Sequence, residues 1–224
     1  MTLTAEQLVD EQPLPFVREG FGAIVADPPW DYTAGKATRI KPPYPTMSVA
    51  EICELPVGVL GADRSQLYLW VTASFLEDGF RVARAWGYEP KSQIVWVKAR
   101  PTIDAGFVRE LLWKVAGNLT KVGDATKIIE RAVRIVQQIG MGSYVRVAHE
   151  LCLVCTRGGM TAAKEARGES SVIIAPRAEH SRKPDELLAK VEKLNPGPYL
   201  ELFARRDREG WAHWGNELGE ETTP

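Results

Sequence analysis

Four consecutive residues near the start of the chain, Asp27, Pro28, Pro29 and Trp30, are the strongest candidates for chemistry. They follow an apolar run typical of a buried strand, and two prolines cannot continue a central strand. The chain must therefore leave the sheet at its carboxyl edge, where open α/β sheets bind ligands. The Asp27 carboxylate and the Pro28 carbonyl would accept hydrogen bonds from the two N–H groups of an exocyclic amine, and Trp30 would offer a ring for stacking. A simple strand-ending turn is the alternative interpretation.

The strands and helices that would position this motif can be predicted from the sequence. Short apolar runs, typical of strands, alternate along the chain with segments that have helical periodicity. The runs are continuous, as in strands covered on both faces, which predicts an α/β fold with a mainly parallel sheet. The predicted strands are residues 22–26, 66–71, 93–97, 151–156, 172–175 and 199–203.

Helix ends are predicted from local signals. Ser48 with Glu51 and Ser74 with Glu77 have the spacing of capping boxes, in which each side chain binds the other residue's free amide. The second of these helices should end before Gly87.

Two further helical regions are predicted later in the chain. Pro184, followed by two acidic residues, is typical of the first turn of a helix. Residues 101–142 hold two amphipathic patterns and are predicted to form a helical hairpin inserted between two strands. No internal repeat divides the chain, so we expect one domain over residues 1–224 with the hairpin as an insertion.

Composition limits the classes of protein to consider. The 224 residues are 45% hydrophobic and 25% charged, which excludes collagen, a long coiled coil and wholesale disorder. No apolar run approaches the roughly 18 residues that a membrane helix needs, and the first residues lack the pattern of a secretory signal. The three cysteines are too few for a disulfide framework, so a reducing cytoplasm is the expected location.

Charge is distributed unevenly along the chain. The net charge is 28 − 29 = −1, but residues 98–146 hold nine basic and four acidic residues, or 9 − 4 = +5. A locally basic segment fits a nucleic-acid groove, and a solvated helical face is the alternative. Lys127, Arg131 and Arg134 would share one face of the hairpin and contact phosphates. The apolar stripe of the hairpin must bury against the body of the domain or a second copy of the chain, which leaves a homodimer open.

Nine stretches of the chain resemble, in order, the DPPW-type N6-adenine methyltransferases of the MT-A70 family, which are related to the catalytic subunit of the eukaryotic mRNA adenosine methyltransferase. They are residues 26–30 (ADPPW), 44–48 (YPTMS), 69–72 (LWVT), 86–88 (WGY), 96–98 (WVK), 149–154 (HELCLV), 183–185 (KPD), 201–205 (ELFAR) and 214–216 (WGN). The resemblance implies a Rossmann-like, S-adenosylmethionine-dependent methyltransferase fold, circularly permuted so that the catalytic motif precedes the cofactor motif.

The same resemblance implies roles for individual residues. Asp27 and the Pro28 carbonyl would bind the adenine amino group and turn its lone pair toward the methyl group of S-adenosylmethionine. Trp30 and Tyr44 would line the pocket for a base taken out of its stack. The residues implied to hold the cofactor are Asp27, Lys183 at its carboxylate, and Phe203, Arg205, Asn216 and Glu217 at its ribose and adenine end. The ribose contacts are the least secure, because eukaryotic relatives have R-P-H-N where residues 205–208 here are RRDR.

Other polar residues in the matched stretches have less definite roles. Lys98 and Glu150 are candidates for binding substrate, and Glu150 is either a pocket acid or an edge residue of its strand. Cys152 and Cys155 have zinc-like spacing, but in a strand they would point to opposite faces and no second pair exists, so no metal is expected.

The sequence therefore predicts an active S-adenosylmethionine-dependent adenine N6-methyltransferase that acts on nucleic acid. The compact chain, without added RNA-binding domains, favours DNA, and RNA is the alternative. A catalytically inactive, nucleic-acid-binding partner subunit is a third interpretation. The intact tetrapeptide at residues 27–30, together with Lys183 and Asn216, favours activity.

Overall fold

A computed structural model of the chain describes residues 13–32, 45–99, 144–178 and 182–215. In these ranges it contains a sheet with the strand order β5-β3-β4-β2-β1-β6-β7. The strands are β1 (Phe21–Ala26), β2 (Gly61–Val71), β3 (Glu89–Ala99), β4 (His149–Arg157), β5 (Val172–Pro176), β6 (Tyr199–Leu202) and β7 (Trp211–Trp214). The α-helices are α2 (Val49–Glu54), α3 (Leu76–Ala85) and α6 (Asp185–Leu194), and short 3-10 helices occur at Val57–Val59, Ala73–Phe75 and Lys164–Ala166.

Most of the strand pairs are parallel. β1 pairs in parallel with β2 and β6, β6 pairs in parallel with β7, and β3 pairs in parallel with β5. β4 runs antiparallel to β2. Every residue of β1 is buried, as are the last seven residues of β2, which accounts for their continuous apolar sequences. The predicted α/β fold with a mainly parallel sheet is thus confirmed, whereas its circular permutation stays a prediction.

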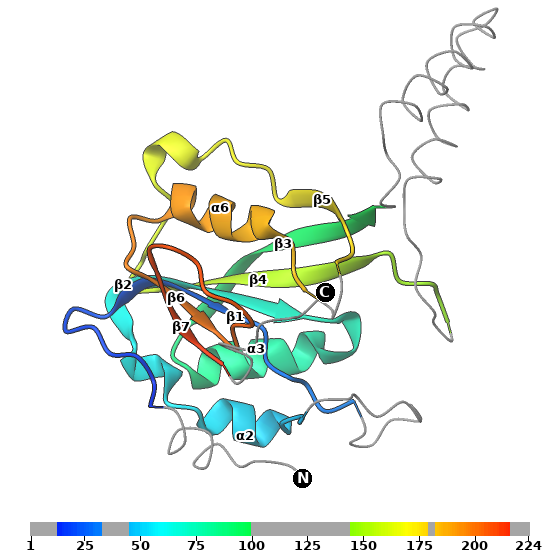
Figure 1. Ribbon diagram of the computed structural model, residues 1–224, viewed down its shortest axis with the longest axis horizontal. Helices are drawn as coiled ribbons and strands as arrows, with labels where there is room; N and C mark the ends of the chain where they lie inside the picture. The colour runs from blue at the N-terminus through cyan, green and yellow to red at the C-terminus, as the bar shows by residue number, and fades with distance from the viewer. Residues whose placement is uncertain (1–12, 33–44, 100–143, 179–181, 216–224) are drawn as a thin grey trace, which may run out of the picture. The chain divides into compact units, whose positions relative to one another are not determined.

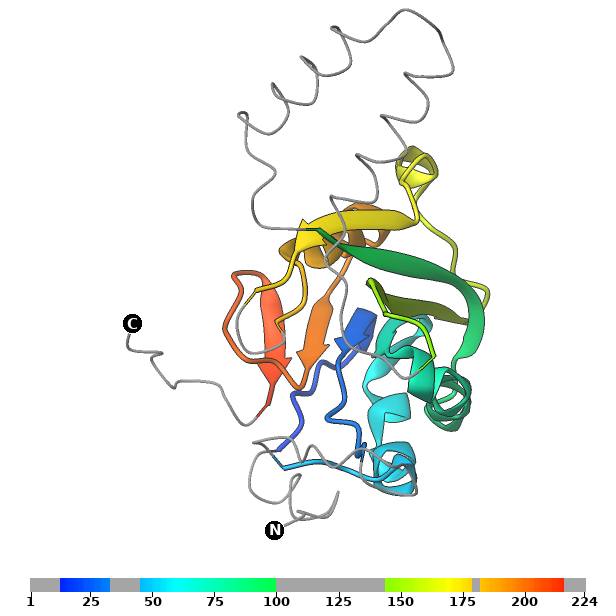
Figure 2. The ribbon, with the colours of Figure 1, turned by 90° about the vertical axis from the view of Figure 1, so that its right-hand side faces the viewer.

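The chain divides into two compact units. The first comprises Met1–Ile94, Leu151–Glu169 and Leu188–Pro224, and the second comprises Val95–Glu150 and Ser170–Leu187. The first unit therefore contains β1, β2, β6 and β7 whole, and Figure 2 shows β1, β6 and β7 side by side. The single domain over residues 1–224 stays a prediction, and the predicted hairpin at 101–142 lies outside the described residues.

Helices cover both faces of the sheet in the first unit (Figure 1). Side chains alternate between the two faces along a strand, so Tyr68 and Val71 of β2 point to opposite sides. The hydroxyl of Tyr68 accepts a hydrogen bond at 2.9 Å from the side-chain amide of Asn195, which directly follows α6. Val71 lies against α3, where a Cβ added to Gly79 would stand 2.4 Å from its Cγ1. The core of this unit is thus a sheet between α6 on one face and α3 on the other.

The predicted strands all occur, with ends that differ by a few residues from those expected. β7 was missed, because His213 interrupts its sequence (WAHW) and no continuous apolar run marks it as a strand. Pro184 directly precedes α6, whose first turn contains two acidic residues as predicted. None of the helices in the described ranges is long and apolar enough to span a membrane.

One of the two predicted capping boxes is confirmed and the other is wrong. Ser48 caps α2: its amide donates to the Glu51 carboxylate at 2.7 Å, and its hydroxyl accepts from the Glu51 amide at 3.3 Å. Before α3 the chain instead forms the 3-10 helix Ala73–Phe75, so α3 begins after Phe75 and Ser74 is not its N-cap. Gly87 follows the end of α3 with a φ of 80°, as its predicted position past the helix requires.

Candidate active site

The Asp-Pro-Pro-Trp motif leaves β1 at its carboxyl end and is held in place by main-chain hydrogen bonds. The Trp30 amide donates to the Pro28 carbonyl at 2.9 Å, and the Met47 amide donates to the Pro29 carbonyl at 2.8 Å. The Asp31 amide donates back to the Met47 carbonyl at 3.1 Å. A carbonyl oxygen has two lone pairs, so Pro28 can still accept a second hydrogen bond. The backbone around Asp27 is therefore fixed before any ligand arrives.

The Trp30 side chain supports the motif from within the core. It is 4% exposed, its ring nitrogen donates to the Trp70 carbonyl at 3.2 Å, and its ring stacks on Phe75 at 5.1 Å between centroids. Tyr32 packs edge-on against the same Phe75 ring, and its hydroxyl donates to Thr72 at 3.3 Å. This arrangement ties the motif to the carboxyl end of β2. Stacking of a target base on Trp30 stays a prediction.

A carboxyl group that the sequence did not single out lies on the neighbouring strand. Glu201 of β6 is in register with Val25 of β1, and Asp27 lies two residues beyond Val25 on the same face. Burial raises the pKa of Glu201 to about 7, and the negative charge of Asp27 adds to that rise, while Arg208 opposes it. At neutral pH this edge of the sheet thus holds two acidic groups, of which Glu201 keeps its proton about half of the time. The one available signal was an acidic residue inside the apolar run at 199–203.

The loop after β6 is tightly constrained. Phe203 has a φ of 61°, in the left-handed region that residues other than glycine rarely adopt. Its ring lies edge-on to Trp214, and the Ala204 amide donates to the Trp214 carbonyl at 2.9 Å. A Cβ added to Gly215 would stand 2.2 Å from the Ala204 carbonyl oxygen, so only glycine fits there. Backbone strain of this kind occurs most often at functional sites.

In the second unit, three predicted site residues form one cluster of charges. Lys98 donates to one oxygen of the Glu150 carboxylate at 2.5 Å, and Lys183 lies 3.4 Å from the other. Burial alone would raise the pKa of Glu150, but the charge of Lys183 and the hydrogen bond and charge of Lys98 together lower it below its ordinary value. Glu150 is therefore ionised at neutral pH, and its side chain, 16% exposed, is not a solvated edge residue. The cluster has a formal charge of +1, which suits an anionic group.

Comparison with known proteins decides what these residues belong to. The family model described as MT-A70 matches residues 21–114 and 118–217. The chain belongs to the MT-A70 family. The match includes the Asp-Pro-Pro-Trp motif after β1, the charge cluster of the second unit and the loop after β6. It confirms the family predicted from the sequence.

Several curated MT-A70 relatives show the extent of the similarity. The chain is 31% identical over 201 residues to the N(6)-adenosine-methyltransferase MT-A70-like protein of Arabidopsis thaliana, covering 88% of this chain and 24% of that protein. It is 29% identical to the N(6)-adenosine-methyltransferase catalytic subunit METTL3 of Homo sapiens, covering 88% of this chain and 28% of that one. It is 25% identical over 223 residues to the type II methyltransferase M.MunI of a Mycoplasma species, covering 90% of this chain and 79% of that protein. The chain thus spans about a quarter of the length of the N6-adenosine methyltransferases that it matches.

The remaining predicted site residues of this MT-A70 chain are only partly placed by the structure. Arg205 lies half-buried in the loop after β6, two residues beyond Phe203. Six others lie outside the described residues, and their roles stay predictions: Tyr44, Lys127, Arg131, Arg134, Asn216 and Glu217.

Metal ligands were a separate question raised by the cysteine spacing. Cys152 and Cys155 are both buried and lie at positions of opposite parity in β4, so they face opposite sides of the sheet. Among the residues that the structure describes, no group of three or more His, Cys, Asp or Glu side chains is arranged to hold a metal ion.

Proposed function

We propose that this chain transfers a methyl group from S-adenosylmethionine to N6 of adenine in nucleic acid, with DNA as the substrate. The observation that carries the proposal is the joint placement of Asp27 and the Pro28 carbonyl at the carboxyl end of β1, on a backbone held by Met47 and Trp30. Membership of the MT-A70 family supports the reaction. The complete tetrapeptide favours an active enzyme over an inactive nucleic-acid-binding subunit.

In this reaction the protein orients the adenine amino group and stabilises the developing charge, and it does not need to abstract a proton first. An adenine amino group has two N–H donors, and Asp27 and the Pro28 carbonyl can accept one each. The hydrogen bond from the Trp30 amide occupies one side of the Pro28 oxygen, which directs the other side toward the substrate. The Asp27 carboxylate also stabilises the positive charge that develops on the nitrogen as the new bond forms. No separate general base is required before the bond is made.

The residues of the first unit fit a positively charged cofactor. S-adenosylmethionine supplies an activated methyl group, because its sulfonium sulfur leaves as a neutral thioether. Asp27 and Glu201 place two acidic groups at the carboxyl edge, where burial and the charge of Asp27 raise the pKa of Glu201. Phe203 and Arg205 are proposed to contact the cofactor from the loop after β6. In the second unit, Lys183 is proposed for the methionine carboxylate.

DNA is preferred to RNA on the extent of the similarities. The match extends over 79% of the type II methyltransferase M.MunI but over about a quarter of the relatives named for adenosine, a ribonucleoside, which supports DNA. RNA is therefore the second candidate substrate. Phosphate contacts through Lys127, Arg131 and Arg134, a homodimer and a cytoplasmic location belong to the same proposal.

The test is mass spectrometry of nucleosides from DNA and RNA incubated with the protein and methyl-labelled S-adenosylmethionine. We expect N6-methyladenine in DNA. Asp27→Asn keeps the size of the side chain but loses its charge, and should lower turnover by about a hundredfold or more. The matched control is Asp63→Asn, an exposed residue of β2, which should keep the parent's turnover.

Each contrary result would correct a different part of the proposal. Turnover near that of the parent in Asp27→Asn would reject the role of the motif. Methylated cytosine as the product would correct the base, and labelled adenosine from RNA alone would correct the substrate.

A further inference from the structure

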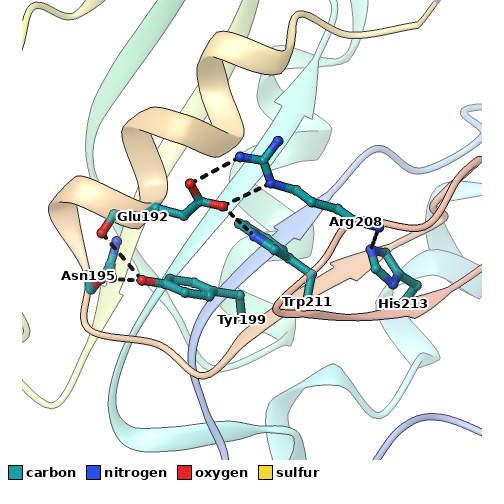
Figure 3. A network of polar contacts seen from close by, with 6 residues as sticks. All are labelled: Glu192, Asn195, Tyr199, Arg208, Trp211 and His213. Atoms are coloured by element: carbon teal, nitrogen blue, oxygen red, sulfur yellow. Dashed lines mark hydrogen bonds and ion pairs between the residues drawn. The ribbon is translucent and has the colours of Figure 1, made fainter.

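An ion pair that the proposed chemistry does not use ties the loop after β6 to α6. The guanidinium of Arg208 binds both oxygens of the Glu192 carboxylate, at 2.9 and 3.0 Å (Figure 3). This two-point fork is the strongest geometry for an arginine–carboxylate pair. The hydrogen bond from Arg208 keeps the pKa of Glu192 below its ordinary value although partial burial opposes it. The pair is therefore charged throughout the neutral range.

Other groups secure the same pair from both sides. The Trp211 ring nitrogen donates to Glu192 at 2.8 Å, and the Trp211 ring stacks on Tyr199 at 4.9 Å between centroids. The Arg208 amide donates to the Nε2 of His213 at 2.9 Å (Figure 3). Arg208 is thus fixed through its side chain by α6 and through its main chain by β7. A solvated surface pair has no such support and contributes little.

The two ends of the loop are held independently. At its start, the Ala204 amide is hydrogen-bonded to the Trp214 carbonyl, and the Ala204 main chain packs against Gly215. At its end, Arg208 is held by Glu192. Residues 205–207 lie between these anchors, and they include Arg205, a proposed cofactor contact. Arg208 is also within electrostatic range of Glu201, whose rise in pKa it opposes, so the pair is coupled to the edge that bears Asp27.

We propose that Arg208, through its ion pair with Glu192, is a positioning residue for the cofactor. The pair holds residues 203–210 in the binding conformation before S-adenosylmethionine arrives. This inference rests on the proposed function. A loop that must be ordered during binding lowers affinity, and a loop that is already ordered does not. Loss of the pair should therefore weaken cofactor binding and leave both the methyl-transfer step and nucleic-acid binding intact.

The test compares two Glu→Gln variants that each remove an ion pair of the same helix. Glu192→Gln cannot hold the Arg208 fork, whereas Glu169→Gln removes ion pairs to Lys190 and Lys193, at 2.7 and 3.1 Å, that do not touch the loop. Calorimetric titration with S-adenosylmethionine should show binding about tenfold or more weaker in Glu192→Gln, since charge-assisted hydrogen bonds are lost. Glu169→Gln should bind within about twofold of the parent.

Kinetics separates positioning from general destabilisation. In Glu192→Gln the KM for S-adenosylmethionine should rise as the affinity falls, while kcat and the KM for a DNA oligonucleotide stay near the parent's values. Arg208→Lys, which keeps the charge without the fork, should fall between the parent and Glu192→Gln and is the second variant if Glu192→Gln does not fold.

Two results would overturn the inference, and they differ. The first is that Glu192→Gln and Arg208→Lys both bind S-adenosylmethionine as tightly as the parent while their melting temperatures fall as in Glu169→Gln. The pair would then have a purely structural role. Failure of the parent protein itself to bind S-adenosylmethionine would overturn the proposed function, and this inference with it.

Discussion

The two ends of the sheet in the first unit differ in how their charged side chains are placed. At one end a cation is hydrogen-bonded to main-chain carbonyls, and at the other end two acidic side chains lie near each other. At the amino end of β2, the side chain of Arg157 donates to four main-chain carbonyls and lies 4.4 Å from the centroid of the Tyr88 ring. The acceptors and distances are Gly58 at 2.6 Å, Trp86 at 2.7 Å, Gly87 at 3.3 Å and Gly61 at 3.4 Å. At the carboxyl end, by contrast, Asp27 and Glu201 bring like charges together on adjacent strands.

Backbone conformation shows the same contrast. At the amino end, the left-handed positions before β1 and after β4 are taken by Gly20 and Gly158, and a Cβ on Gly158 would stand 2.1 Å from the Asp63 carbonyl oxygen. At the carboxyl end, Phe203 holds a left-handed conformation despite its side chain. The amino end is thus built for stability, whereas the carboxyl end keeps electrostatic repulsion and a strained backbone, features that cluster at functional sites.

The largest expected effect on stability is at the amino end. Arg157→Met keeps most of the side-chain volume but leaves four carbonyls without their donor, so the free energy of unfolding should fall by about 3 kcal/mol. Urea denaturation measures this. The control is Arg84→Met, whose ion pair to Glu89 is long, at 3.7 Å, and exposed, and whose loss should cost about 0.5 kcal/mol. Equal losses in the two variants would contradict a special role for Arg157.

The next effect is a pH dependence that originates at the carboxyl end. Since the pKa of Glu201 rises from 4.5 unfolded to about 7 folded, its contribution to stability is full below pH 4.5 and is lost as the pH rises through 7. Relative to Glu201→Gln, the parent should therefore lose about 2 kcal/mol of unfolding free energy between pH 5 and pH 8. Urea denaturation at the two pH values tests this, with Glu54→Gln on the exposed side of α2 as the control for a surface charge. Curves that stay parallel for the parent and Glu201→Gln would show that burial does not perturb this carboxyl group.

The smallest effect concerns the backbone at Phe203. Both Phe203→Ala and Phe203→Gly lose the ring contact with Trp214, so their difference isolates the main chain. Glycine is usually less stable than alanine, but at a φ of 61° the order should reverse, with Phe203→Gly more stable by about 1 kcal/mol. Thermal denaturation of the two variants side by side gives this difference. The usual order would mean that the loop relaxes when the ring is removed.

What the sequence predicted was mostly local. β1 and the exit of the chain at Asp27 followed from an apolar run and two prolines, which act within a few residues. The environment of Glu201 could not be predicted in this way, because it depends on the register of β6 against β1, two strands far apart in the chain. The Ser74 box failed because its spacing alone does not exclude the 3-10 turn that forms there.

At Arg208, one of the positions where the chain departs from the pattern of the eukaryotic relatives, the structure shows a specific contact. Arg208, in the loop after β6, forms an ion pair with Glu192 of α6, sixteen residues earlier. No periodicity links two such positions, so spacing could not reveal the pair. The Ser48 capping box, in which both partners lie within one turn, shows the opposite case.

Cys152 and Cys155 face opposite sides of the sheet, so their thiols can report separately on how the helices on each side of the first unit detach from the sheet. Cys152 is in register with Trp70 and faces the layer of α6, whereas Cys155 is in register with Leu67 and faces the layer of α3. Burial raises the pKa of Cys155 to about 12, so in the folded protein it is almost never a thiolate. Half-exposed Cys53 on α2 is the thiol that a reagent meets first. Pulsed alkylation followed by peptide mass spectrometry would then time the undocking of each helical layer separately, without a single engineered residue.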